Sequence, residues 1–126
     1  MESRKIEAIV SLPAPQRYSH FIKFVADCQS AWGLYLEGWA LAATDDDQPV
    51  FPIWPAREFA QLCAVADWTG YVPKVIEIDD LMDGLLPSLR ESGTLLGVFY
   101  TPNDKGILPD TEAFEADMKQ ELAKFE

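Results

Sequence analysis

The residues that could perform covalent or acid–base chemistry are one histidine and two cysteines. A nucleophilic thiol needs an activating base within reach, and His20 is the only histidine. Projected at 100° per residue, His20 falls on the polar face of a predicted helix with Lys23 and Asp27, so we expect a solvated side chain. Cys28 and Cys63 fall on apolar helix faces, where a thiol packs as a small hydrophobe, and their spacing matches no metal or redox pair. We therefore predict no catalytic residue.

Three consecutive aspartates, Asp45, Asp46 and Asp47, superficially suggest a divalent cation. An EF-hand loop alternates its ligands, with a central glycine and a terminal glutamate, whereas Gln48 and Pro49 follow here. The triplet therefore predicts an exposed acidic hairpin turn. The chain also lacks the GxxxxGK[ST], GxGxxG and HExxH patterns, so we expect no metal and no cofactor.

Aromatic residues at the expected ends of strands and in loops are candidates for a binding surface. They are Trp32, Trp39, Trp54, Trp68 and Tyr71. Ligand grooves are often built at such places, but tryptophan is also an ordinary core residue, so both interpretations stay open. Arg17 lies near the edge of an apolar helix face and would need a partner there. An ion pair with Glu37 or Glu58 and an anion-binding role are the two alternatives.

The strongest global signal is negative charge: 21 Asp and Glu residues stand against 10 Lys and Arg, a net charge of −11. Because phosphate groups require clustered positive charge, we expect neither nucleic acid nor a membrane surface as a partner. A basic protein partner is compatible with this charge. Acidity of this degree is also common in proteins that only need to remain soluble.

The chain shows no membrane or export signal. No stretch approaches about 18 apolar residues, and the first 16 residues lack the uninterrupted apolar core of a signal peptide. The expected location is the cytoplasm, with both thiols reduced.

Apolar patterning and turn residues predict five strands. Two lie within 32–44, with Glu37 and Gly38 as their turn, and a third covers 50–54. The others cover 74–78 and 94–100. Because Pro52 lacks a backbone donor, its strand is expected at a sheet edge or ending in a bulge. The nearly all-apolar segment 94–100 is expected to be the central strand.

Helical spacing predicts four helices. The first two cover 16–28 and 56–66. The third begins at Asp79 or Asp80, and the last at Asp110 or Thr111. The short segment 6–10 has no defined type. We predict one α+β domain over residues 1–126, with about four helices packed on a mixed sheet of about five strands, the first three a meander.

The successive segments RYSHFIKFVAD, WGLYLEGWAL, FPIWP, WTGYVPKVIEI and LLGVFY resemble the bacterial domain-of-unknown-function family numbered 2750. The similarity runs from about Arg17 to Tyr100. The resemblance implies a small single-domain cytoplasmic protein of bacteria, and it brings no reaction, cofactor or functional residue.

Two function hypotheses follow. The first is a non-enzymatic protein that binds and neutralises or regulates a basic protein, such as a toxin or an enzyme, with Asp45, Asp46 and Asp47 among its contacts. The alternative is a small-ligand module whose pocket is formed by the aromatic residues named above. Either a monomer or a homodimer is compatible with both.

Overall fold

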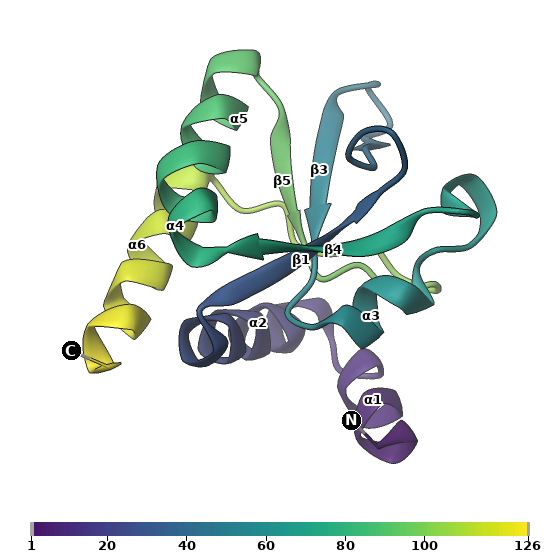
Figure 1. Cartoon of the computed structure of the whole chain (residues 1–126), viewed down its shortest axis with the longest axis horizontal. Coiled ribbons are helices and arrows are strands. Elements are labelled where there is room, and N and C mark those ends of the chain that lie inside the picture. The colour runs from purple at the N-terminus through teal and green to yellow at the C-terminus, as the bar shows by residue number, and fades with distance from the viewer. Residues whose placement is uncertain (1, 126) are drawn as a thin grey trace.

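A mixed β-layer lies at the centre of the structure, a computed structural model that describes residues 2–125. The strands are β1 (Ser30–Tyr35), β2 (Ala42–Ala43), β3 (Pro49–Ile53), β4 (Val72–Glu77) and β5 (Leu95–Val98). β1 pairs with antiparallel β4, and β3 lies between antiparallel β2 and parallel β5. The longer strands meet near the centre of Figure 1. This arrangement confirms the predicted α+β class.

The two sheets are joined through Trp32 and Trp54. The N–H group of each donates to the carbonyl of the other, over 2.9 and 2.8 Å. After β1 the chain turns back through a bridge between Tyr35 and Trp39, but it pairs as a strand with β3 only at β2. The first three strands therefore do not form the expected meander, because β1 pairs with β4 and lies in a different sheet from β2 and β3.

Helices lie on two sides of this layer (Figure 1). They are α1 (Ser3–Val10), α2 (Ala14–Cys28), α3 (Arg57–Leu62), α4 (Ile78–Asp80), α5 (Leu86–Ser92) and α6 (Thr111–Leu122). A π-helical segment, η2 (Leu81–Leu85), joins α4 to α5, and η1 (Ala66–Trp68) and η3 (Ala123–Phe125) are short 3₁₀ turns. In Figure 1, α4, α5 and α6 lie along one side of the layer, and α2 and α3 lie below it. The undefined segment 6–10 belongs to α1.

The expected caps were right for the last helix and wrong for the third. The Asp110 carboxylate accepts a hydrogen bond from the Glu112 N–H at 3.2 Å, which satisfies one free donor at the start of α6. Asp79 and Asp80 instead lie within α4, whose first residue follows Glu77 without a side-chain cap.

Pro52 does not mark a sheet edge, contrary to expectation, because β3 has neighbours on both sides. Val50 pairs with Ala42, and Trp54 pairs with Trp32. Alternate residues of a strand direct their backbone groups to the same edge, so the nitrogen of Pro52 lies between these two pairs. Proline's missing N–H group lies where β3 passes from pairing with β2 to the bridge with Trp32 of β1, and a missing donor is tolerated at such a position.

β5 is not the central strand, also contrary to expectation. It pairs with β3 along one edge, and its other edge makes only an isolated bridge between Val98 and Ile107. Its residues Leu96 and Val98 are nevertheless buried, as the apolar run predicts.

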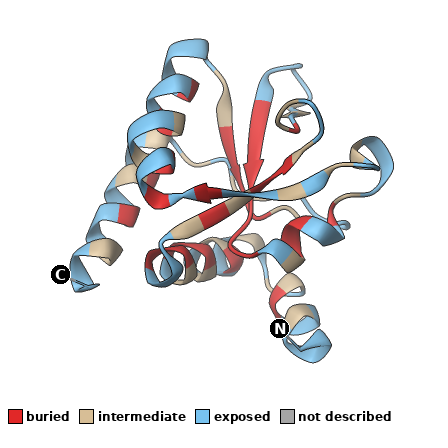
Figure 2. Ribbon diagram, in the orientation of Figure 1, coloured by how far each residue is buried: buried red, intermediate tan, exposed pale blue. Residues whose placement is uncertain are grey.

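The core fills the space between the β-layer and the helices that cover it, and Figure 2 shows buried residues both on the strands and on these helices. Its largest side chains include Phe21, Trp54, Phe59, Phe99 and Phe114. The rings of Phe59 and Phe99 have centroids 4.9 Å apart, which couples α3 to the chain after β5. Among the described residues, no helix combines the length and apolar character needed to cross a bilayer.

Candidate functional site

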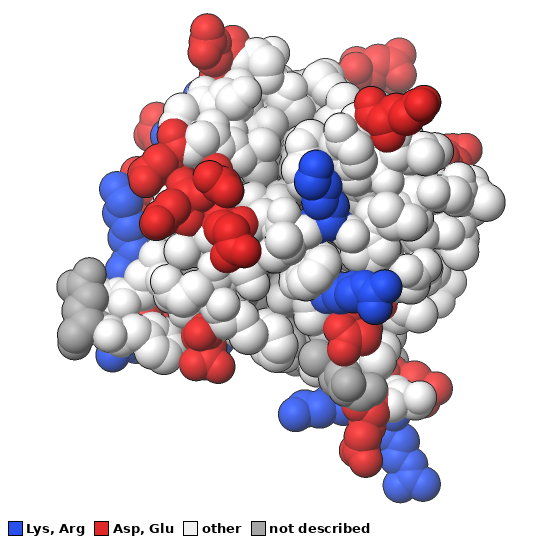
Figure 3. Space-filling view, in the orientation of Figure 1, with Lys and Arg blue, Asp and Glu red and all other residues white. Residues whose placement is uncertain are grey.

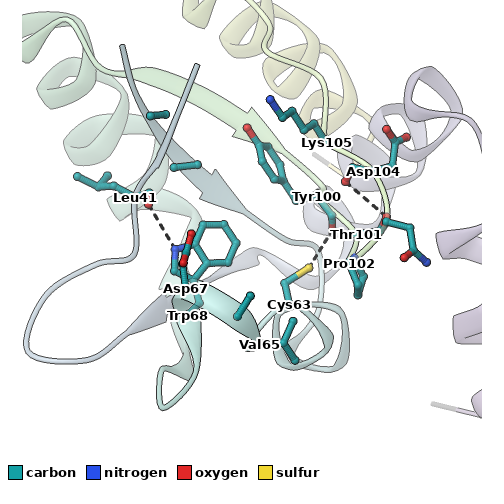
Figure 4. A pocket seen from close by; sticks show the side chains of 14 residues that line it. Leu41, Cys63, Val65, Asp67, Trp68, Tyr100, Thr101, Pro102, Asp104 and Lys105 are labelled. Atoms are coloured by element: carbon teal, nitrogen blue, oxygen red, sulfur yellow. Dashed lines mark hydrogen bonds between the residues drawn. The ribbon is translucent and has the colours of Figure 1, made fainter. Parts of the chain in front are cut away.

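An open groove of about 580 Å³ lies where three distant segments meet, at residues 41–43, 63–68 and 100–105. Figure 4 shows Leu41 on one side, Tyr100 and the following loop on the other, and the segment from Cys63 to Trp68 below them. α3 ends at Leu62, before the predicted end of its helix, and this early end allows the chain to turn and line the groove.

One wall of the groove is apolar and accessible. Leu41 and Val65, which line the groove from different segments, are 52% and 51% exposed. Trp68 is half-buried, and its indole N–H donates to the Leu41 carbonyl at 3.3 Å. The wall therefore offers apolar contact area without any rearrangement of the core.

Two residues at the groove have left-handed backbone conformations that are unusual outside glycine. Ala66, which lines the groove, has φ 53°, and Phe99, which directly precedes it, has φ 64°. Such a conformation costs on the order of 1 kcal/mol or more and persists only where the surrounding contacts hold it. Phe99 turns the chain out of β5 so that the Tyr100 carbonyl accepts from Trp54 Nε1 at 2.9 Å and Cys63 Sγ at 3.4 Å.

Arg17 holds the loop that forms the far wall. Its side chain is 1% exposed, and it donates through Nε to the Phe99 carbonyl (3.1 Å) and through Nη2 to the Lys105 carbonyl (3.0 Å). Nη2 also contacts Asp104 Oδ2 at 3.1 Å, and Nη1 donates to the Leu12 carbonyl at 2.6 Å. The expected ion pair with Glu37 or Glu58 is thus replaced by one with Asp104. Arg17 supports the groove from behind.

The groove carries more negative than positive charge. Asp67 lines it, is exposed, and has no hydrogen bond or ion pair among residues 2–125. Lys105 Nζ lies 3.8 Å from Asp45 Oδ1, and both side chains are well exposed, so this contact is worth little. A cation entering the groove would therefore meet the free carboxylate of Asp67, whereas Asp45 lies outside the groove lining.

Cys63 lies at the base of the groove and is buried, as predicted. Burial raises the pKa of its thiol to about 11, so the sulfur is protonated at neutral pH and packs as an apolar group.

Cys28 is exposed, contrary to the prediction that it faces the core. It is the last residue of α2, and the buried residues of that helix end at Ala26.

His20 is not solvated as expected. Its ring stacks on Phe24 with centroids 5.6 Å apart and lies 6.4 Å from Phe59 and 6.1 Å from Phe99. Nδ1 is buried and has no hydrogen-bond partner in the described part of the chain. Burial and, to a lesser extent, the charge of Lys5 lower the His20 pKa, so the imidazole is neutral at pH 7. Helical projection failed because α3 and the Phe99 segment cover the face that α2 alone would expose.

The structure separates the predicted aromatic residues instead of gathering them. Trp68 lines the groove, whereas Trp54 is fully buried behind it. Trp32, Trp39 and Tyr71 are half-buried and lie outside its lining.

Trp39 occupies a separate cluster with Tyr35, whose ring lies 5.3 Å away. Lys74 Nζ lies 4.0 Å from the Tyr35 ring centre and 5.4 Å from that of Trp39. The lining residues that sequence reasoning missed include Leu41, Val65 and Tyr100, which carry no local motif.

Asp45, Asp46 and Asp47 form an exposed turn between β2 and β3, as predicted. Thr44 closes the turn, since its hydroxyl accepts from the Gln48 N–H at 3.1 Å. No group of three His, Cys, Asp or Glu side chains within residues 2–125 is placed to hold a metal ion.

A second acidic surface lies where β4 runs into α4 and η2. Glu77, Asp79, Asp80 and Asp83 are all exposed there. Figure 3 shows acidic side chains gathered over this part of the molecule. The negative charge is thus distributed over several surfaces and is not confined to the aspartate turn.

Comparison with known proteins places the chain in a family. The family described as Protein of unknown function (DUF2750) matches residues 18–118, most of the chain, and the chain therefore belongs to it. No curated protein matches the sequence. The family carries no assigned reaction or ligand, so the function has to be argued from the groove itself.

Proposed function

We propose that this member of the family is a non-catalytic binding domain of the bacterial cytoplasm whose groove receives part of a basic protein. One observation carries the proposal: the groove lining combines two accessible apolar side chains, Leu41 and Val65, with the unpaired carboxylate of Asp67. Apolar contact supplies affinity, and the carboxylate selects a cation. The net charge of −11 would accelerate the encounter with a positively charged partner.

The chemistry of the groove supports binding over catalysis. Its thiol, Cys63, is held protonated by burial and donates to a backbone carbonyl. The imidazole of His20 lies among aromatic rings outside the groove lining. A nucleophile and its activating base must be within hydrogen-bond reach, and these two groups do not supply such a pair.

The test is capture of a partner from extracts of cells that naturally make the protein, at low and moderate salt. Val65→Arg places a positive charge on the groove wall, and Val72→Arg places the same charge on β4, at a residue that is 58% exposed and outside the groove. We expect Val65→Arg to abolish capture and Val72→Arg to retain it. If both variants capture the partner equally, the groove is not part of the interface. If capture does not change with salt concentration, electrostatic attraction does not contribute to binding.

A second candidate function is the binding of a small molecule in the same groove. Its specific support is the combination of Trp68, Tyr100 and a concave volume within the usual range for ligand sites. Native mass spectrometry of protein purified at low salt separates the two functions. A retained mass of a few hundred daltons that is lost in Trp68→Ala supports the small ligand, whereas a protein-sized addition supports the basic partner.

A further inference from the structure

The short strand β2 presents a free edge. The Thr44 N–H donates to the Gln48 carbonyl at 2.9 Å, toward the β3 side. Ala42 has the same orientation as Thr44, because alternate residues of a strand direct their backbone groups to the same edge. Leu41 and Ala43 therefore direct their N–H and C=O groups away from β3.

This free edge faces the groove. The Leu41 carbonyl accepts from the indole of Trp68, and both residues line the cavity. Ala43 shares that edge, lines the same cavity, and has no backbone hydrogen bond outside the β2–β3 pair within residues 2–125. One N–H and one C=O group of Ala43 are thus available to a bound molecule.

A second free strand edge, that of β4, is protected. Along β4, the Ile78 N–H donates to the Gln29 carbonyl, so Pro73 and Val75, which have the opposite orientation, direct their backbone groups outward. Pro73 has no N–H to offer, and the neighbouring Lys74 adds charge, two devices that discourage strand addition. β2 carries neither device.

We propose that the groove binds an extended peptide segment that adds to β2 as a strand. The inference rests on the proposed function and specifies what part of the basic partner enters the groove. The peptide exchanges backbone hydrogen bonds with Ala43, lays apolar side chains on Leu41 and Val65, and directs a lysine or arginine to Asp67. Backbone pairing gives register, and the cation gives selectivity.

Charge complementarity favours this occupant over a neutral or acidic peptide. Of the two carboxylates that line the groove, Asp104 is paired with Arg17 and Asp67 is unpaired within residues 2–125. A cationic side chain can pair with Asp67. An acidic peptide would add like charge beside it.

The probe is a pool of acetylated and amidated heptapeptides with lysine at the centre and Ala, Val, Leu or Phe at the other positions. We expect members of the pool to bind, to perturb Trp68 emission and to slow amide hydrogen exchange at Ala43 by about tenfold or more. Replacing the central lysine by norleucine is expected to weaken binding to the wild type and to have little effect on binding to Asp67→Asn.

Ala43→Pro removes the N–H donor and also fixes φ, whereas Ala43→Val retains the donor at the same site. We expect about tenfold weaker binding for the proline variant and a change under about threefold for the valine variant. If Ala43→Pro fails to fold, peptides methylated in turn at each backbone nitrogen provide the same test on the wild-type protein, and a single sensitive position supports strand addition.

The outcomes separate this inference from the function on which it rests. Equal binding by the two Ala43 variants, with no sensitive peptide nitrogen, would overturn strand addition. If no peptide binds while Val65→Arg still abolishes capture of the natural partner, the extended peptide is wrong and the groove function stands. If Val65→Arg leaves capture intact, the groove function itself fails.

Discussion

The Nε atom of Arg17 donates to the carbonyl oxygen of Phe99 over 3.1 Å, between residues 82 positions apart in the sequence. Phe99 has a left-handed backbone, and its carbonyl marks the point where β5 passes into the groove loop. A buried guanidinium can hold such a turn because its planar array of donors reaches several carbonyls at once. The shape of the groove therefore depends on a residue that does not line it.

Replacing Arg17 by Met is expected to destabilise the fold by about 3 kcal/mol, since several backbone carbonyls lose a buried donor. Asp104→Asn is the matched control. Its side chain is 58% exposed, so we expect a loss under about 1 kcal/mol. Urea unfolding of both variants measures the difference, and similar losses would mean that the ion pair, not the carbonyl contacts, carries the stability.

Trp54 and Trp68 are expected to respond differently to replacement by Phe. Trp54 is fully buried and donates to the Tyr100 carbonyl, so Trp54→Phe is expected to cost about 2 kcal/mol. Trp68 donates over 3.3 Å in a half-buried position, and Trp68→Phe is expected to cost less than about 1 kcal/mol. Thermal unfolding tests this order; a larger loss for Trp68 would place it in the core.

Folding stability should depend on the protonation of His20. Its pKa in the folded state lies below the ordinary 6.5, so the unfolded chain binds the proton first as the pH falls. Stability is therefore retained above about pH 6.5 and is lost as the pH falls from there through the folded-state pKa.

His20→Phe lacks this contribution to the free energy of unfolding. As the pH falls from 7.5 to 5, the free energy of unfolding of the wild type should therefore decrease relative to that of the variant. Urea unfolding across that range measures the gap between the two proteins. Parallel pH profiles would show that other groups account for the acid sensitivity.

Two glycine substitutions should act in opposite directions. At Gly84, in η2, an added Cβ meets nothing within 4 Å, and Gly84→Ala is expected to stabilise the helix by about 0.5–1 kcal/mol.

At Gly106 an added Cβ collides with the Val98 carbonyl oxygen, which accepts a hydrogen bond from the Ile107 N–H. Gly106→Ala should cost about 2 kcal/mol or more, because backbone must move. Melting temperatures measure both, and a stable Gly106→Ala would show that the loop adjusts freely.

Local sequence sufficed for most of the elements. The apolar spacing in 16–28 predicts α2, Asp110 predicts the start of α6, and the short apolar runs predict β3 and β5. These features depend on contacts within about four residues or on the pattern of one face. The aspartate turn at 45–47 belongs to the same class, because a tight turn is determined by its own residues.

Positions within the sheet were predicted less well. Pro52 was expected at an edge, yet β3 is interior, because its parallel pairing with β5 brings together segments about 45 residues apart and leaves no local signature. The partial burial of His20 has the same origin. A helical wheel places a side chain relative to its own helix and contains nothing about the rings of Phe59 and Phe99 that close over it.

The sequence by itself determined the α+β class, the acidic charge and the types of the local elements, because each follows from composition or from short-range periodicity. The family followed from the resemblance of successive segments, and the match over residues 18–118 confirmed it. Only the tertiary structure decided that Trp54 is core while Trp68 lines a groove, and that Arg17 serves a loop near Asp104. Those roles depend on which of several chemically equivalent residues come together when residues 41–43, 63–68 and 100–105 meet. Long-range packing selects among them, and no local pattern encodes that selection.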